Sequence, residues 1–410
     1  MKKILLCGIL ALAAGGMAFG QWPDGFSVTG QLYTGLRADF VGGDWYTDKN
    51  SPAYLSEYER ASFGFWNTDT EQNRVQLTMR YEQENYGFAF RPRFLFADSG
   101  TADVHYAYGW FELMNDMIRV TAGKINNAQW YSPDTIERHY SNGYFRIEVK
   151  PIDGLNFGWA LGNRDYAFPE SDISYAPGGL VGKIGDVFAA SSFGAKYTSD
   201  VFTFAAGLEL RPAGANRRTN GDDFLAALTS GSSLGGGTVA AGKTAMNAYA
   251  GLMVNPVDGL TIKAGVDSGN LDIADETGYI WLDQYLEYSL GSVTPRIELH
   301  QIMDISKTSP GKWTSPDSDS VDQTPVYMEF IPGVDFDISD NLSGYVDIPV
   351  KLLDKQLEIG VKPGVIYNFG PGLEIGCFYR LAISNADYEI YDNKGKAINN
   401  AVQINFAWSF

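Results

Sequence analysis

The chain has 410 residues, of which 45% are hydrophobic and 20% are charged, and its formal net charge is -18. Charged residues (20%) are too few, and aromatic side chains (14%) too many, for an intrinsically disordered chain. The excess of acidic residues argues against nucleic acid and anionic lipid head groups as partners. Three histidines and two cysteines provide little material for a zinc site or a thiol-based active site, so we expect no metal and no cofactor.

The N-terminus has the features of a secretory signal peptide. Two lysines follow the initiator methionine, and residues 4–17 are mostly apolar. Ala18 and Gly20 then provide the small residues that a signal peptidase requires before its cleavage site. We expect cleavage before Gln21. This divides the chain into a signal peptide (1–20) and a mature protein of one domain (21–410).

The mature sequence is dominated by an alternation of apolar and polar residues. Near its end, Val402, Ile404 and Phe406 alternate with Gln403 and Asn405. A half-buried β-strand gives this pattern because successive side chains point to opposite faces. Most such segments are about 9 to 11 residues long, which suits a tilted strand that crosses a bilayer. The predicted strands are 26–40, 73–82, 86–96, 102–113, 117–125, 143–150, 155–162, 192–198, 201–211, 247–254, 260–267, 278–289, 293–303, 325–337, 342–351, 357–368, 373–383 and 401–410.

The connections between these segments alternate in length. Short ones are typical hairpin turns, and they fall at 84–85, 115–116, 151–154, 199–200, 256–259, 291–292, 340–341 and 370–372. Between them lie mostly longer polar connections, such as 41–72 and 212–246. A transmembrane barrel has short periplasmic turns and longer outer loops, whereas a soluble β-sandwich has no reason to alternate in this way.

The sequence therefore predicts an all-β protein. We expect a transmembrane antiparallel up-and-down β-barrel of 16–18 strands, with 18 as the best count, that occupies residues 21–410 and carries long extracellular loops. An even strand count places both termini on the side of the short turns.

The last strand resembles that of bacterial outer-membrane β-barrel proteins, which commonly end in an aromatic residue preceded by apolar residues at alternate positions. Phe406, Trp408 and Phe410 occupy these places. The resemblance implies a bacterial outer-membrane location, contact with outer-membrane lipid, and recognition of these three residues as an assembly signal by the barrel-assembly machinery. Within this class the length and strand count look like a porin, whether general or substrate-selective, and a homotrimer is left open. Loop 126–142 corresponds to the third outer loop, but it lacks the acidic-Gly signature of general porins.

The alternation also predicts which charged side chains face the lumen. If apolar residues face lipid, His105 and five arginines of the first half point inward: Arg80, Arg91, Arg93, Arg119 and Arg146. Inward carboxylates are concentrated in the second half, at Asp283, Glu287, Glu298, Glu329, Glu358 and Glu374. One basic and one acidic wall would produce a transverse field in a narrow pore. The alternative is that these residues form only the balanced ion pairs that any polar barrel interior needs.

The same parity sorts the aromatic side chains. It predicts that five of them face lipid, some as part of interfacial girdles: Tyr106, Tyr108, Trp110, Phe157 and Trp159. Trp281 and Tyr285 have inward parity, which would suit a row of aromatic rings that guides sugars.

Residues 237–244 match the phosphate-binding loop pattern G-x-x-x-x-G-K-T. The segment before it, 230–236, is rich in Gly and Ser and does not read as the buried strand that this motif requires. We therefore interpret the match as part of an outer loop.

Two other clusters bear on function. Hard oxygen ligands crowd one connection (Asp267, Asn270, Asp272, Asp275 and Glu276), but their spacing matches no twelve-residue calcium loop, so a solvated acidic loop is the favoured interpretation. His139 lies near Asp134 and Glu137 without a recognisable nucleophile signature, so we expect no enzyme.

Passive diffusion of small hydrophilic solutes or ions is therefore the expected function. The alternative is a surface adhesin or a ligand-binding barrel that uses its long outer loops.

Overall fold

A computed structural model describes residues 24–43, 60–65, 73–95, 101–125, 145–161, 191–212, 243–269, 271, 279–304, 326–353, 356–384 and 397–409. The predicted signal peptide (1–20) and the loop 126–142 lie outside these ranges. Within them, no helix has the length and apolar character needed to span a membrane.

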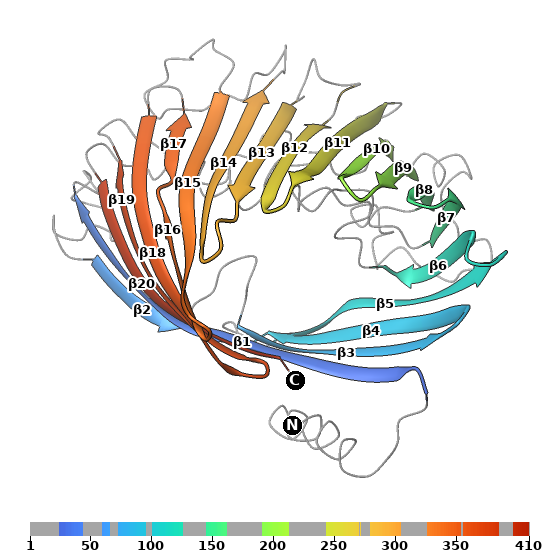
Figure 1. Ribbon diagram of the computed structural model, residues 1–410, viewed down its shortest axis with the longest axis horizontal. Coiled ribbons are helices and arrows are strands. Elements are labelled where there is room, and N and C mark those ends of the chain that lie inside the picture. The colour runs from blue at the N-terminus through green and yellow to red at the C-terminus, as the bar shows by residue number, and fades with distance from the viewer. Residues whose placement is uncertain are drawn as a thin grey trace.

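The described strands form one antiparallel sheet that closes on itself, as Figure 1 shows. In chain order they are β1 (Phe26–Gly43), β2 (Arg60–Phe65), β3 (Arg74–Gln83), β4 (Tyr86–Leu95), β5 (Thr101–Leu113), β6 (Ile118–Lys124), β7 (Phe145–Ile152), β8 (Leu155–Leu161), β9 (Ser191–Thr198), β10 (Phe202–Pro212), β11 (Thr244–Val257), β12 (Leu260–Gly269), β13 (Tyr279–Tyr288), β14 (Val293–Asp304), β15 (Val326–Ser339), β16 (Leu342–Asp347), β17 (Val350–Leu353), β18 (Gln356–Gly370), β19 (Leu373–Ser384) and β20 (Ala397–Ser409). The predicted all-β up-and-down barrel is confirmed.

At two places around the barrel, two strands lie end to end and together take the place of one. β3 pairs with residues 26–33 of β1 and β2 pairs with residues 36–41, on the same side of β1. β16 and β17 both lie between β15 and β18. Counted in this way, the barrel has 18 strands, which confirms the best count. The sequence pattern did not predict β2, whose six residues fall in the connection expected over 41–72.

The interruption between β16 and β17 falls at Pro349. Proline has no N–H to donate to a ladder and is therefore placed where a strand breaks. The Ile348 N–H donates to the Pro332 carbonyl (2.9 Å), and the Pro349 carbonyl accepts from the Gly360 N–H (2.8 Å). Both neighbouring strands thus remain bonded to the chain at the break.

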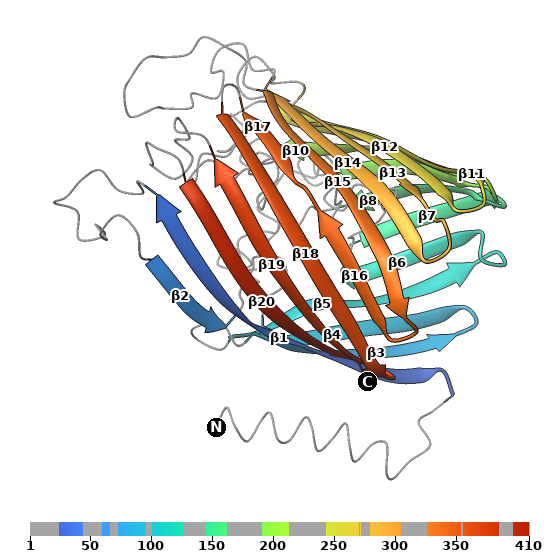
Figure 2. The ribbon, with the colours of Figure 1, turned by 60° about the vertical axis from the view of Figure 1, so that its left-hand side comes forward.

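The barrel closes between its first and last strands (Figure 2). β1 pairs with β20 from Gln31 opposite Ser409 to Gly43 opposite Ala397. At this seam a Cβ atom on Gly35 would lie 2.6 Å from the carbonyl oxygen of Ile404. Close approach of the two strands therefore requires a residue without a side chain at Gly35.

Each of the eight predicted short turns joins two consecutive strands. They lie at one end of the barrel, because connections in an up-and-down barrel alternate between its ends. The turn between β7 and β8 shows why glycine is needed. Gly154 has φ +77°, and a Cβ atom there would lie 2.2 Å from the carbonyl oxygen of Thr198.

Candidate functional site

In this barrel apolar side chains are exposed on the outer face and polar side chains are buried on the inner face, which is the reverse of a soluble protein. In β10, Phe202 and Phe204 are exposed, whereas Thr203 and Glu209 are buried. The same inversion recurs around the barrel, with exposed apolar residues such as Leu252, Ile297 and Ile359 on the outer face. Buried polar or charged residues on the inner face include Gln76, Thr121, Glu148, Glu209, Asn247, Asp267, Asp283, Glu329, Glu358 and Gln403. The inner face is thus the candidate functional site.

Four of the five predicted arginines on β3 to β7 form ion pairs with carboxylates of the same wall. The pairs are Arg80–Glu82 (3.0 Å), Arg93–Asp103 (2.6 Å), Arg119–Glu112 (3.5 Å) and Arg146–Glu148 (3.1 Å). The predicted basic wall thus also contains carboxylates, and these four pairs match the alternative of balanced ion pairs.

Arg91 differs from these four arginines. Its Nε donates to the hydroxyl of Thr78 (2.7 Å), and its guanidinium lies 4.7 Å from the centre of the Tyr106 ring. Among the described residues, no carboxylate lies within ion-pair distance of it. Arg91 thus brings a positive charge to this wall that no carboxylate of the described residues pairs with.

The aromatic column of β5 corrects the predicted lipid-facing positions. Tyr106 and Trp110 are buried with Tyr108 packed against them, and Arg80 and Arg119 lie over the Trp110 ring. All three rings are therefore on the inner face.

A β-bulge explains the error. Pro92 faces Val104 and Arg91 faces Tyr106, which leaves His105 as an extra residue in β5. The extra residue reverses the alternation beyond it. Phe157, by contrast, is exposed on the outer face, and half-buried Trp159 donates its indole N–H to the Ser191 hydroxyl (3.1 Å).

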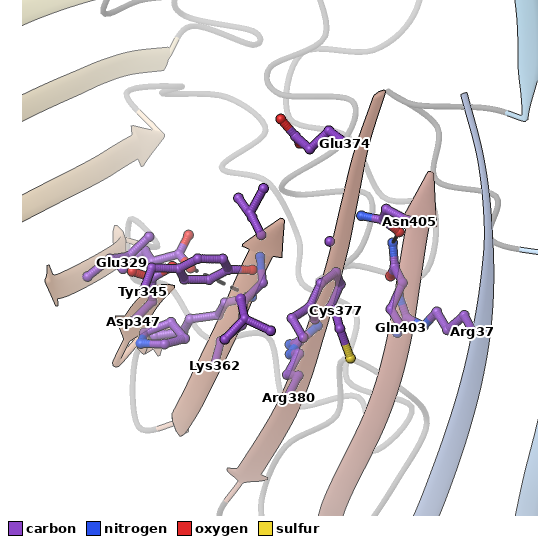
Figure 3. Close-up of a pocket in the computed structure, with 17 residues that line it drawn as sticks. Arg37, Glu329, Tyr345, Asp347, Lys362, Glu374, Cys377, Arg380, Gln403 and Asn405 are labelled. Atoms are coloured by element: carbon purple, nitrogen blue, oxygen red, sulfur yellow. Dashed lines mark hydrogen bonds and ion pairs between the residues drawn. The ribbon is translucent and has the colours of Figure 1, made fainter. Parts of the chain in front are cut away.

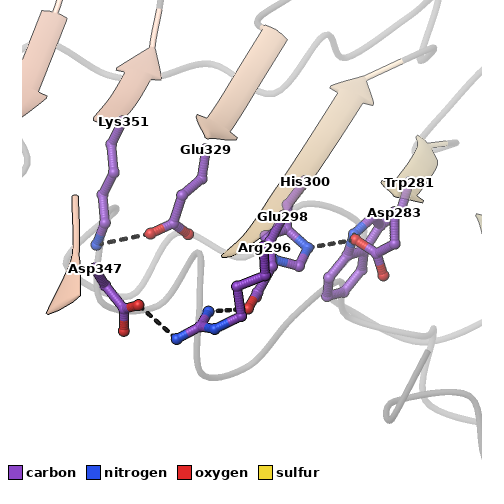
Figure 4. A network of polar contacts seen from close by, with 8 residues as sticks. All are labelled: Trp281, Asp283, Arg296, Glu298, His300, Glu329, Asp347 and Lys351. Atoms are coloured by element: carbon purple, nitrogen blue, oxygen red, sulfur yellow. Dashed lines mark hydrogen bonds and ion pairs between the residues drawn. The ribbon is translucent and has the colours of Figure 1, made fainter. Parts of the chain in front are cut away.

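The opposite wall contains a continuous polar network across β13 to β16 (Figure 4). Arg296 lies among three carboxylates, at 2.6 Å from Glu298, 2.8 Å from Asp335 and 2.5 Å from Asp347. His300 continues this network, with Nδ1 at 2.6 Å from Asp283 and Nε2 at 3.6 Å from Glu298. A guanidinium surrounded by carboxylates stabilises their shared burial.

The Asp283 carboxylate accepts a further bond from the Trp281 indole N–H (2.5 Å), and Glu287 accepts one from the Tyr285 hydroxyl (2.5 Å). Both aromatic residues therefore turn their polar atoms toward inner-face carboxylates. This agrees with the inward parity predicted for Trp281 and Tyr285.

Glu329 and Glu358 meet at a shared cation. Lys351 Nζ lies 3.8 Å from each carboxylate, and Glu358 also lies 3.3 Å from Arg380. The sequence interpretation named several carboxylates of this wall but missed Asp335, Asp347 and the cations. The available signal was parity, since Arg296 and Glu298 occupy alternate positions of one predicted strand.

A cavity of about 480 Å³ lies beside this network and extends from β15 to β20 and β1 (Figure 3). Its lining includes four cations (Arg37, Lys351, Lys362 and Arg380), three carboxylates (Glu329, Asp347 and Glu374), the Tyr345 and Phe378 rings, and the amides of Gln403 and Asn405. None of these cations was singled out from the sequence.

The predicted assembly signal lies at the closing seam. Phe406 is half-buried, and Trp408 is exposed and pairs with Leu32 of β1 and Leu373 of β19. Phe410 lies outside the described residues.

The phosphate-loop match and the acidic cluster are described only in part. Thr244 begins strand β11, whereas a phosphate-binding loop continues into a helix. Asp267 is buried and accepts a hydrogen bond from the Tyr279 hydroxyl (3.3 Å). Among the described residues no group of His, Cys, Asp and Glu could hold a metal ion.

No family model and no curated protein matches the chain. Solved structures with a similar fold include the outer membrane channel DcaP of Acinetobacter baumannii, at 9% identity and a TM-score of 0.48, which covers 95% of this chain and 99% of that one. OpdQ of Pseudomonas aeruginosa has 11% identity, a TM-score of 0.47 and coverage of 93% and 98%. OmpT, an outer membrane protein of Vibrio cholerae, has 12% identity, a TM-score of 0.42 and coverage of 93% and 97%.

Proposed function

We propose that this protein is a bacterial outer-membrane porin through which small hydrophilic solutes or ions diffuse passively, without catalysis. The observation that carries the proposal is the inverted distribution of side chains in a closed barrel, with apolar residues outside and charged residues inside. Closure leaves no unpaired strand edge, which is the condition for β-strands to cross a bilayer. Barrels of 16 to 18 strands are wide enough to leave an aqueous channel.

In this proposal the inner-face charges line the pore. The arginine wall contributes Arg80, Arg91, Arg93, Arg119 and Arg146, and the opposite wall contributes Glu298, Glu329 and Glu358. Ion pairs hold most of these side chains against the wall, so the pore presents fixed dipoles with a few uncompensated charges. Polar solutes are favoured over apolar ones in such a lumen.

The partners follow from the same proposal. Outer-membrane lipid covers the exposed apolar face, and the barrel-assembly machinery reads the last strand at Phe406, Trp408 and Phe410. A homotrimer stays a prediction that chemical cross-linking of the detergent-extracted protein would test.

Conductance tests the proposed function directly. The refolded protein, verified as a barrel by different gel mobilities of unheated and boiled samples, is added to a planar bilayer and to liposomes that contain sugars of increasing size. We expect discrete conductance steps and swelling that stops above a size limit. A folded barrel that gives neither would contradict the porin and favour a ligand-binding barrel or an adhesin.

A further inference from the structure

The cavity between β15 and β1 contains one cation that differs from its neighbours. Among the described residues, Lys362 has no carboxylate within ion-pair distance of its ammonium group. The ammonium instead lies over two aromatic rings, 4.8 Å from the centre of Phe378 and 5.8 Å from that of Tyr345. Aromatic faces attract a cation but do not neutralise its charge. Lys362 is therefore half-buried, and no described carboxylate forms an ion pair with it.

Two of the three carboxylates in the cavity are already paired with cations. Asp347 is bound by Arg296 at 2.5 Å, and Glu329 lies 3.8 Å from Lys351. The third, Glu374, lies six positions before Arg380 on β19, at the other end of the cavity in Figure 3. Asp347 lies opposite Lys362 in the strand register, but its carboxylate is already bound by Arg296. Among the described residues, the ammonium of Lys362 therefore remains open to a second anion.

Arg380, Gln403 and Asn405 also line the cavity. Arg380 makes one contact of 3.3 Å, with Glu358, so most of its five N–H donors remain for a second acceptor. Gln403 and Asn405 are hydrogen-bonded to each other (2.6 Å), and the other amide atom of buried Gln403 has no partner among the described residues. This atom is the Oε1 carbonyl oxygen, so only an N–H or O–H of a ligand would satisfy it, and it adds no donor for an anion.

The lining also contains apolar side chains, among them Ile331, Ile366 and Phe378. The volume of about 480 Å³ is within the range of small-molecule sites. A ligand that matches this lining has a negative charge at one end and an apolar body.

We propose that this cavity is a binding site for small organic carboxylates on their way through the barrel. The carboxylate lies between Lys362 and Arg380, and the apolar body packs against Phe378 and the isoleucines. The role of this site in transport rests on the proposed porin function, whereas binding of a carboxylate can be measured whether or not the barrel conducts.

The test compares benzoate with benzamide, which has the same shape without the charge. Binding to the refolded full-length barrel in detergent is measured by calorimetry, and block of the open channel is measured in a planar bilayer. The informative variant is Lys362→Met, which keeps an unbranched apolar stem over the rings. The matched control is Lys263→Met, because Lys263 also lies over an aromatic ring (Tyr285, 4.9 Å) on the inner face but outside the cavity.

We expect saturable benzoate binding by the wild type, no binding of benzamide, and affinity reduced about tenfold or more in Lys362→Met, the loss typical of one charge-assisted contact. Lys263→Met should bind as the wild type does. Equal effects of the two substitutions, or equal binding of benzamide, would overturn the proposal. Binding without any conductance would refute the porin and leave the site intact, whereas conductance without binding would refute the site alone. If Lys362→Met does not fold, Arg380→Gln replaces it in the same comparison.

Discussion

The guanidinium of Arg91 lies over the ring of Tyr106, 4.7 Å from its centre, on the inner face of the barrel. Tyr106 faces inward only because His105 is an extra residue in β5. The bulge thus brings the Tyr106 ring against Arg91. Of the five predicted arginines, Arg91 is the one without a carboxylate partner among the described residues.

Arg91 should influence ion selectivity more than the four arginines of this wall that form ion pairs. In Arg91→Gln we expect the reversal potential in a salt gradient to shift toward cations, because an uncompensated positive charge is removed from the wall. The shift should weaken as salt rises, since the screening length falls from about 30 Å at 0.01 M to about 8 Å at physiological salt. Arg91→Lys, which keeps the charge, is the control. Identical reversal potentials of all three proteins at low salt would show that Arg91 only braces the wall.

Arg296 should be important for stability, because three carboxylates depend on it. In Arg296→Met, Glu298 and Asp347, whose side chains are 27% and 14% exposed, lose their common partner, and removal of one member of a buried ion pair costs about 3–5 kcal/mol. The control is Arg80→Met, whose partner Glu82 is about half exposed, so that about 0–1 kcal/mol is expected. The midpoint of urea unfolding, followed by tryptophan fluorescence, measures both. A smaller loss for Arg296→Met than for Arg80→Met would contradict this account.

Much of the fold could be predicted from the sequence, because period-two alternation and turn residues are local signals. Predicted strand boundaries such as 260–267 and 373–383 differ from β12 and β19 by two residues or fewer at either end. β2 was missed because it is short and is defined by pairing with β1, which is not local information.

The site was less predictable. Parity identified the inner-face arginines and carboxylates, but it could not show that Arg93 meets Asp103 or that Arg296 meets Asp347, since these contacts depend on register between strands. Because of a single bulge at His105, the alternation predicted that Tyr106 faces lipid, whereas it lies on the inner face. Alternation predicts faces only as far as the next irregularity in a strand.

The closing seam should not tolerate a side chain at Gly35. In Gly35→Ala the new Cβ atom would lie 2.6 Å from the Ile404 carbonyl oxygen, so β1 and β20 must move apart. Overpacking of this kind typically costs about 1–3 kcal/mol, and we expect a smaller fraction of heat-modifiable barrel after refolding. Gly376→Ala is the control, because its Cβ atom would meet Asn405 at an ordinary 3.9 Å. Equal yields of the two variants would show that the seam is less closely packed than the structure indicates.

The inverted distribution of side chains, on which the proposed function rests, can be tested within one strand. Leu252 and Met253 are consecutive in β11, and Leu252 is 39% exposed on the outer face. Met253 pairs with Lys263 on the inner face, so a carboxylate at this position would lie opposite a cation. Leu252→Glu would instead place the carboxylate in lipid. Charged residues on the lipid face cost up to about 2–4 kcal/mol at the bilayer centre, less for Glu and less near the interfaces.

We therefore expect Leu252→Glu to lower the urea midpoint of the barrel in lipid vesicles and Met253→Glu to leave it nearly unchanged. In detergent micelles, which adapt to the protein surface, the difference between the two variants should shrink. The comparison separates burial in lipid from a general loss of packing, because both variants carry the same new side chain on the same strand. If Met253→Glu proves the more destabilising in lipid, the inner and outer faces have been exchanged, and the porin proposal loses the observation that carries it.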